Sequence, residues 1–340
     1  MRCVIEIYFS ILPDMLFENY PFEQRKLVLG EIRRLLRQNI FDKKDHITEI
    51  NAGLAVIKKA PFQKTQNIFK HYLWHHVEDA LKFTINLNID LSLFPVTIHK
   101  GAEVTRVTDE KELMEILPYS LANEIGNRIF ELLIISQIAR PGSLKLREGI
   151  IWINGNRHLE TIPSIMNCRE AMELRIKTGY PHVVFLKLTD LYRWATEKGI
   201  LFSEIPENSY QYVLNYLSYV QGDSGQIHSV LYKMMALEKL YTQGVNQIAT
   251  QLNEKIQVFL GEMNSYKSQI KKMYDIRSRY YHGSIPLPPM HKADHFEELP
   301  AFQQELDEAS NLSLLLIIAT LQKMYKENLV DIKFLTTYKP

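Results

Sequence analysis

The chain has 340 residues, of which 46% are hydrophobic and 23% charged, as in folded proteins that are long enough for two domains. Its 40 Lys and Arg side chains nearly balance 39 Asp and Glu side chains, so any nucleic-acid contact must come from a local patch. Cys3 and Cys168 lie in no CxxC or Cys/His pattern, which excludes a disulfide framework and a cysteine zinc site and favours a reducing, cytoplasmic location.

Two apolar segments could be mistaken for targeting or membrane signals. The N-terminal segment is interrupted by Glu6, Pro13 and Asp14 and has no small-residue cleavage site, so it reads as a buried strand. The apolar run at residues 312–321 is about half the ~20 residues needed to cross a bilayer. We therefore predict a core helix there and no membrane partner.

The first 200 residues mix short β-rich runs with helical patterns, which predicts an α+β region. The strands are expected at residues 4–10, 91–98, 149–155 and 182–188, and the helices at residues 23–40, 120–139 and 189–199. Residues 140–156 match no phosphate-binding loop and read as a turn and a hairpin.

One histidine pair in this region has the spacing of metal ligands on a helix. His71 and His75 stand four residues apart, with His76, Glu78 and Asp79 nearby. The segment lacks the HExxH pattern, and no third ligand follows at a defined spacing. We therefore predict no metal site and no cofactor.

From about residue 205 the pattern is helical, and several amphipathic helices joined mostly by short turns predict an all-α, up-and-down bundle. The helices are expected from the Asn208–Ser209 cap to about residue 220, and at residues 227–242, 245–263, 265–281 and 300–327. We place the boundary between an α+β region, residues 1–204, and a helical domain, residues 205–340, at the linker "SEIPENS".

Two charged residues interrupt apolar stripes on neighbouring predicted helices. Arg277 continues a stripe that includes Ile270 and Tyr274, and Glu238 continues one that includes Met234. Because a buried guanidinium needs a partner, we expect these two side chains to pair, with His282 one turn beyond Arg277. Such a constellation is either an interior salt bridge or a functional site.

The residues around Arg277 are locally basic and aromatic, although the chain as a whole is neutral. Five cations accompany the single acid Asp275 between residues 264 and 283, and four tyrosines are interleaved with them. Cations for phosphate and rings for bases suit an RNA-binding cleft, whereas a solvated helix face is the alternative. The predicted RNA-binding residues are Lys267, Lys271, Lys272, Arg279, Tyr280 and Tyr281.

The segment "MYDIRSRYYHG" resembles the Arg-x4-6-His motif of HEPN domains, most closely that of the Apea-like branch. "ALEKLYT" and "QLNEKIQVFL" are similar to the preceding helices of that branch, whose glutamate stands where Glu238 does. The resemblance covers about residues 205–330 and does not extend to the first 200. One departure is Ser284, which replaces the tyrosine that nucleotidyltransferase antitoxins modify in HEPN toxins, so control at that position is doubtful.

The resemblance implies a metal-independent endoribonuclease that acts as a homodimer, with the two motif helices forming one cleft. It assigns His282 to proton transfer, Arg277 to the phosphate, Ser278 to a hydrogen bond and Glu238 to orientation of Arg277 or His282. The partner would be RNA, with tRNA as one candidate, in anti-phage defence or a toxin-like stress response.

Two questions stay open at this point. The first is whether the chain is a nuclease or a catalytically silent HEPN module for RNA binding or dimerisation. The second is control, for which residues 1–204 could sense a trigger or bind a regulatory partner, and the acidic run from Asp294 to Glu308 could shield the basic cleft.

Overall fold

The computed structural model describes residues 1–11, 22–38, 40–41, 47–58, 79–93, 96–100, 103–107, 110–220, 227–244, 246–263, 266–285 and 300–334. His71 and His75, and the acidic residues from Asp294 to Glu298, lie outside these ranges. The chain forms two compact units, one of residues Met1–Leu133 with Lys145–Ser164 and one of Ile134–Leu144 with Ile165–Pro340. None of the helices described is long and apolar enough to span a bilayer.

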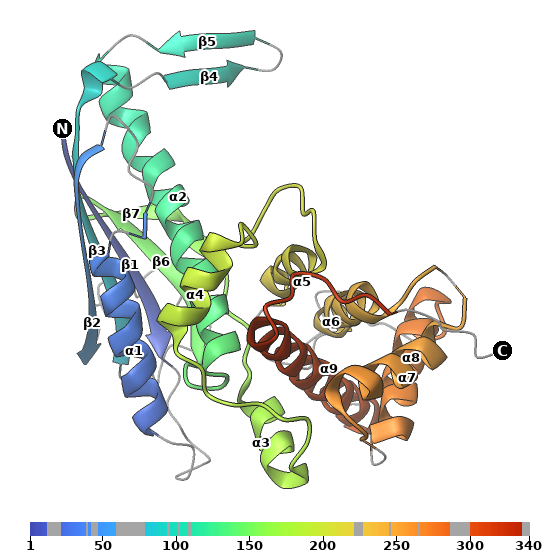
Figure 1. The fold of residues 1–340 in the computed structure, drawn as a ribbon. Helices are drawn as coiled ribbons and strands as arrows, with labels where there is room; N and C mark the ends of the chain where they lie inside the picture. Colours follow the sequence, from blue (N-terminus) through green and yellow to red (C-terminus); the bar gives the residue numbers. More distant parts are fainter. Residues whose placement is uncertain are drawn as a thin grey trace. The chain divides into compact units, whose positions relative to one another are not determined.

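The first unit is built on a five-stranded antiparallel sheet of strand order β2-β3-β1-β6-β7 (Figure 1). Its strands are β1 (Arg2–Ile11), β2 (Ile47–Lys58), β3 (Asp79–Ile89), β6 (Leu146–Ile153) and β7 (Asn156–Ile162). Strands β4 (Val96–Lys100) and β5 (Glu103–Val107) form a separate hairpin. The helices are α1 (Phe22–Arg37) and α2 (Glu110–Ala139), of which the residues from Ile134 onward belong to the second unit, and a short 3-10 turn, η3, spans Leu91–Leu93.

The connections between these strands follow a recognised pattern. The chain runs from β1 through α1 to β2, leaving β3 between the two strands, and then from β3 through α2 to β6, leaving β1 between those. Two interleaved connections of this kind define the split βαβ, or ferredoxin-like, arrangement. Strand β7 adds a fifth strand to the sheet beside β6. The two strands are joined by the two-residue turn Asn154–Gly155, whose φ values of 49° and 83° are those of a type I′ hairpin.

The core of this unit follows the two-residue period of its strands. Cys3, Ile5 and Ile7 of β1 are buried, as are Phe83 and Ile85 of β3, whereas the residues between them are more exposed. Helix α2 packs closely on the β6–β7 side, because a Cβ added at Gly126 would lie only 3.1 Å from Cδ1 of Ile162. The α+β character predicted for the N-terminal region is therefore confirmed.

The predictions for single elements in this region had mixed outcomes. The strand at residues 4–10 and the helices at residues 23–40 and 189–199 are present. The strand predicted at residues 149–155 is β6, which ends at Ile153, and the hairpin predicted within residues 140–156 has its turn at Asn154–Gly155 and continues into β7. The helix predicted at residues 120–139 is longer, because α2 begins at Glu110 and continues through Pro118. At residues 91–98, the segment begins with η3, and the strand β4 begins only at Val96.

The strand predicted at residues 182–188 is wrong. Its backbone is hydrogen-bonded, but the partners are not a neighbouring strand. The amide of Val184 donates to Oε1 of Gln322 at 3.0 Å, and the carbonyl of Val184 accepts from Nε2 of Gln322 at 2.8 Å. A buried glutamine side chain from a distant helix therefore takes the place of a strand in satisfying this backbone.

The second unit is helical. Its helices are α3 (Arg169–Thr178), α4 (Leu188–Glu197), α5 (Ser209–Ser218), α6 (Ile227–Tyr241), α7 (Ile248–Leu260), α8 (Lys267–Tyr281) and α9 (Pro300–Lys326). Helix α9 packs against α3, α6, α7 and α8 (Figure 1). Its apolar run at residues 312–321 is buried, as expected of a core helix.

This unit includes residues 165–204, which the sequence analysis placed before the domain boundary at residue 205. The reason is that α3 and α4 pack on the last long helix. The ring of Trp194 on α4 lies 5.3 Å from that of Tyr325, and its Nε1 donates to Asn328 at 2.9 Å. Glu170 of α3 accepts a hydrogen bond of 3.2 Å from Asn311 on α9.

Candidate functional site

Arg277 on α8 and Glu238 on α6 form the ion pair that the interrupted stripes predicted. Nη2 of Arg277 donates to Oε2 of Glu238 at 3.3 Å, and Nε lies 3.1 Å from Oε1, too misaligned for a second hydrogen bond. The two side chains are half-buried, with 24% of Arg277 and 17% of Glu238 exposed. The pair therefore lies at the edge of the helical core and is still accessible from solvent.

The buried face of α8 is not the one that the sequence pattern predicted. Its buried residues are Ile270, Met273 and Ile276, so the core-facing stripe is rotated away from Arg277. Tyr281 is 58% exposed, and its ring centre lies 4.5 Å from the guanidinium carbon of Arg277. At this distance the ring stabilises the cation from its outer side. Arg277 thus contacts a carboxylate and the ring of Tyr281, and the ring centre of Tyr274 lies 5.7 Å from its guanidinium carbon.

The end of α8 presents His282 to solvent. The amide of Ser284 donates to the carbonyl of Arg279 at 2.8 Å, and the amide of Gly283 donates to that of Tyr280 at 3.0 Å. These two bonds, with Gly283 at φ 64°, form a Schellman cap. His282 is the exposed cap residue, and its side chain makes no hydrogen bond to any other residue that the structure describes. The imidazole is therefore accessible for proton transfer.

Burial perturbs the acid of the pair. Removal from water raises the pKa of Glu238 above its ordinary value of 4.5, and the guanidinium of Arg277 opposes this rise. Arg277 carries five N–H groups, and Glu238 engages only one edge of the guanidinium. The remaining N–H groups are available to an anion such as a phosphate.

The predicted RNA-binding residues do not lie on one face. Lys267 and Lys271 are exposed on α8, and Ser278 is half-buried on the same helix. The ring of Tyr280 lies 6.4 Å from that of His228 on α6. Lys272 and Arg279, in contrast, line a pocket to which Arg277 does not contribute. The basic residues of α8 are therefore divided between two sides of the helix.

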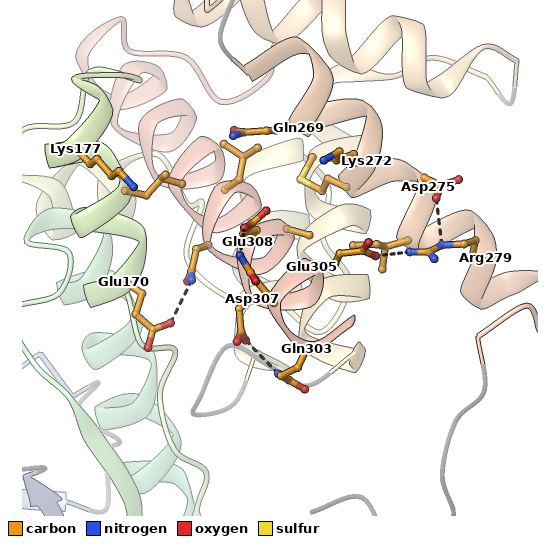
Figure 2. A pocket seen from close by; sticks show the side chains of 17 residues that line it. Glu170, Lys177, Gln269, Lys272, Asp275, Arg279, Gln303, Glu305, Asp307 and Glu308 are labelled. Carbon is orange, nitrogen blue, oxygen red and sulfur yellow. Dashed lines mark hydrogen bonds and ion pairs between the residues drawn. The ribbon is translucent and has the colours of Figure 1, made fainter. Parts of the chain in front are cut away.

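That pocket has a volume of about 1040 Å³ and lies among α3, α8 and α9 (Figure 2). Arg279 is held there between Asp275 of α8 at 3.1 Å and Glu305 of α9 at 2.9 Å. The lining has more acids than bases: Glu170, Asp275, Glu305, Asp307 and Glu308 against Lys177, Lys272 and Arg279. At Glu305, the acidic run contacts one of the cations predicted to bind RNA.

The sequence analysis missed a group of tyrosines next to the Arg277–Glu238 pair. Tyr212 and Tyr216 lie on one side of α5 with ring centres 6.4 Å apart, and Nζ of Lys239 lies 3.9 Å from the ring centre of Tyr212. Tyr219, which caps α5, stacks on Tyr232 of α6 at 4.9 Å. The spacing of four and three residues along a predicted helix was the signal that could have identified this row.

Lys233 was also missed. It lies on the buried side of α6, is 1% exposed, and its Nζ hydrogen-bonds to the hydroxyl of Ser310 on α9. Burial lowers its pKa from 10.5 to about 8, against the opposing effects of Cys168, Glu170 and Asp307. Ser310 is fully buried, so this lysine–serine pair has no access to a substrate. A lone lysine in an otherwise mixed helical pattern gives no sequence signal of such burial.

Comparisons of the chain with protein-family models, with curated proteins and with solved structures found no significant match. Among the described residues, no cluster of histidine, cysteine or carboxylate side chains could hold a metal ion. Functional inference therefore depends on the geometry around Arg277 and on the motif that contains it.

Proposed function

We propose that the chain is a metal-independent endoribonuclease of the HEPN type, with Arg277 and His282 in its active site. The observation that carries the proposal is the position of these two residues. A half-buried, paired arginine about one turn before the end of a helix is followed by an exposed histidine at the cap of the same helix. A solvent-accessible guanidinium and an exposed imidazole on one helix are groups that RNA cleavage can use.

The reaction uses the nucleophile that RNA itself carries. The 2′-oxygen attacks the neighbouring phosphorus, the bond from phosphorus to the 5′-oxygen breaks, and the products are a 2′,3′-cyclic phosphate and a 5′-hydroxyl. His282 transfers a proton, and the free N–H groups of Arg277 stabilise the charge on the phosphate oxygens. Glu238 holds Arg277 in place, and Ser278 supplies a hydrogen bond within the cleft.

A homodimer completes this chemistry. One proton must leave the 2′-oxygen while another reaches the 5′-oxygen on the opposite side of phosphorus. A single motif contains one histidine, so two motif helices facing each other would supply both groups. The exposure of Tyr281 and His282 leaves the end of α8 accessible to a second copy.

A second candidate is a silent module that binds RNA or mediates dimerisation. It is favoured by the contact of Glu238 with both Nε and Nη2 of Arg277, which is the geometry of a structural ion pair. In that case Arg277 stabilises the contact between α6 and α8, and His282 has no catalytic part. The two candidates predict different effects of removing the imidazole of His282: the nuclease would lose cleavage, and the silent module would be unaffected.

Cleavage of total cellular RNA by the purified protein in EDTA tests the proposal. We expect discrete fragments with cyclic-phosphate ends from the wild type and none from His282→Ala, with both proteins folded. His182→Ala is the matched control, because His182 is an exposed histidine elsewhere in the helical unit. No cleavage by a wild-type dimer that binds RNA would favour the silent module, whereas equal cleavage by both variants would remove His282 from the active site.

A further inference from the structure

The surface next to the Arg277–Glu238 pair carries two pairs of neighbouring tyrosines. Tyr212, Tyr216 and Tyr219 on α5, with Tyr232 on α6, are here called the tyrosine track. The other side of α5 is buried, as shown by Tyr210, Val213 and Leu217, so the three α5 tyrosines lie on its outer side. Tyr219 is 59% exposed, although an isolated tyrosine side chain gains by burying its ring.

The rings of the track are ordered by their neighbours. Tyr219 and Tyr232 stack with an interplanar angle of 20°, and Tyr212 lies beneath the ammonium group of Lys239. Stacked rings lose little entropy when a further flat group is added to the outer face. The track is therefore prepared to bind planar groups, and Lys239 adds a positive charge beside it.

Two neighbouring residues of α6 link the track to Arg277. Lys239, which covers Tyr212, directly follows Glu238, which pairs with Arg277. Burial raises the pKa of Tyr216, and Tyr212, Glu238 and Tyr281 lie close enough for their charges to raise it further. The tyrosine track therefore lies close to the ion pair of Glu238 with the guanidinium that would hold the phosphate.

We propose that the tyrosine track binds unpaired bases of an RNA strand whose phosphate lies at Arg277. This inference rests on the proposed function and adds to it the residues that select single-stranded RNA. Base-paired RNA hides the faces of its bases and presents only its shape and backbone, so it cannot stack on the rings. A single strand offers both the bases for the tyrosines and the phosphates for Lys239 and Arg277.

The test measures binding and is made in the full-length His282→Ala protein, so that it does not depend on cleavage. The probe is a fluorescent oligouridine of about ten nucleotides, compared with an abasic strand of the same length and with the oligouridine–oligoadenosine duplex. Tyr219→Leu, which removes the exposed ring, should raise the Kd for oligouridine about five-fold or more, whereas Tyr219→Phe should change it less than about two-fold. Abasic-strand affinity should be unchanged in both variants.

Tyr119→Leu is the matched control, because Tyr119 is an exposed tyrosine of the sheet unit. Equal binding of oligouridine by Tyr219→Leu and Tyr219→Phe would overturn the inference, as would an equal loss for the abasic strand. A dimer that becomes a monomer in Tyr219→Leu with unchanged RNA affinity would also overturn it and would assign the surface to self-association.

Failure of this inference is distinguishable from failure of the proposed function. If the wild type cleaves RNA in EDTA but binding does not depend on the tyrosine rings, the inference about the track is refuted and the proposed nuclease function is kept. If binding depends on the tyrosine rings but no RNA is cleaved, the inference about the track is supported and the proposed nuclease function is refuted.

Discussion

Lys233 provides a quantitative test of the helical core. Its side chain is fully buried, and its ammonium group has the hydroxyl of Ser310 as its hydrogen-bond partner. Burial lowers the pKa of Lys233 from 10.5 to about 8, so at neutral pH the folded state carries a charge that it would be more stable without. Replacement by methionine keeps an unbranched side chain of similar length and removes this charge.

The size of the effect follows from the pKa difference. A shift of about 2.5 pH units, at about 1.36 kcal/mol per unit, corresponds to roughly 3 kcal/mol of unfolding free energy. Loss of the hydrogen bond to Ser310 reduces this gain in stability by about 1 kcal/mol. Lys233→Met should therefore be more stable than the wild type by about 2 kcal/mol near neutral pH.

The pH dependence has a definite sign. Below about pH 8 Lys233 is protonated in both states, and the folded state bears the full cost of the buried charge. Between about pH 8 and 10.5 the folded state loses the proton first, the unfolded state binds more protons, and wild-type stability rises with pH. The advantage of Lys233→Met should therefore shrink as the pH rises through this window.

Urea unfolding followed by far-ultraviolet circular dichroism, at about pH 7 and about pH 10, measures both effects. Lys271→Met is the control, because Lys271 is exposed on α8 and its substitution should change stability little at either pH. A Lys233→Met protein that is less stable than the wild type at neutral pH would refute the reasoning. It would mean that the ammonium interacts with its surroundings more favourably than burial disfavours it.

Two further predictions concern the two sides of the end of α8. Glu305→Gln removes one of the two acidic partners of Arg279 and should raise RNA affinity about two- to five-fold at low salt, an effect that high salt should abolish. Fluorescence anisotropy measures it, and an equal rise in Glu327→Gln, at the far end of α9, would show that only net charge matters. Gly283→Ala should lower unfolding free energy by about 1 kcal/mol, because φ is 64° there although no atom obstructs an added Cβ. Chemical denaturation checks this, and an equal loss in Gly283→Asn would contradict it, because asparagine tolerates the left-handed conformation.

The helices after residue 205 were predictable because each has a strong local signal. The cap of α5 is one example, since the side chain of Asn208 accepts the amide of Gln211 at 2.9 Å as the sequence indicated. The turn of the β6–β7 hairpin also has a local signal, because the dipeptide Asn154–Gly155 favours two positive φ values. Where local and tertiary preferences agree, periodicity and turn residues were sufficient.

The failures occurred where a distant residue decides the structure. An apolar, β-rich stretch such as residues 182–188 favours a strand, but the carboxamide of Gln322 satisfies its backbone and no strand forms. For the candidate site, the pairing of Arg277 with Glu238 was predictable because a guanidinium near a core needs a carboxylate. The division of the α8 cations between two sides was not, because the rotation of a helix depends on its packing partners.

The way in which α2 ends limits how this protein can be divided. Residues 134–144 belong to the helical unit although they precede the last two strands of the sheet. The carbonyl of Ile138 accepts from Nε2 of Gln322 at 2.7 Å, and the carbonyl of Ala139 accepts the amide of Leu186 at 2.8 Å. A fragment that starts at residue 165 or 205 therefore lacks acceptors that the core helix and its neighbour use. Because the helical unit is made of two separate segments of the chain, neither a single cut nor a single recombination event could separate it intact.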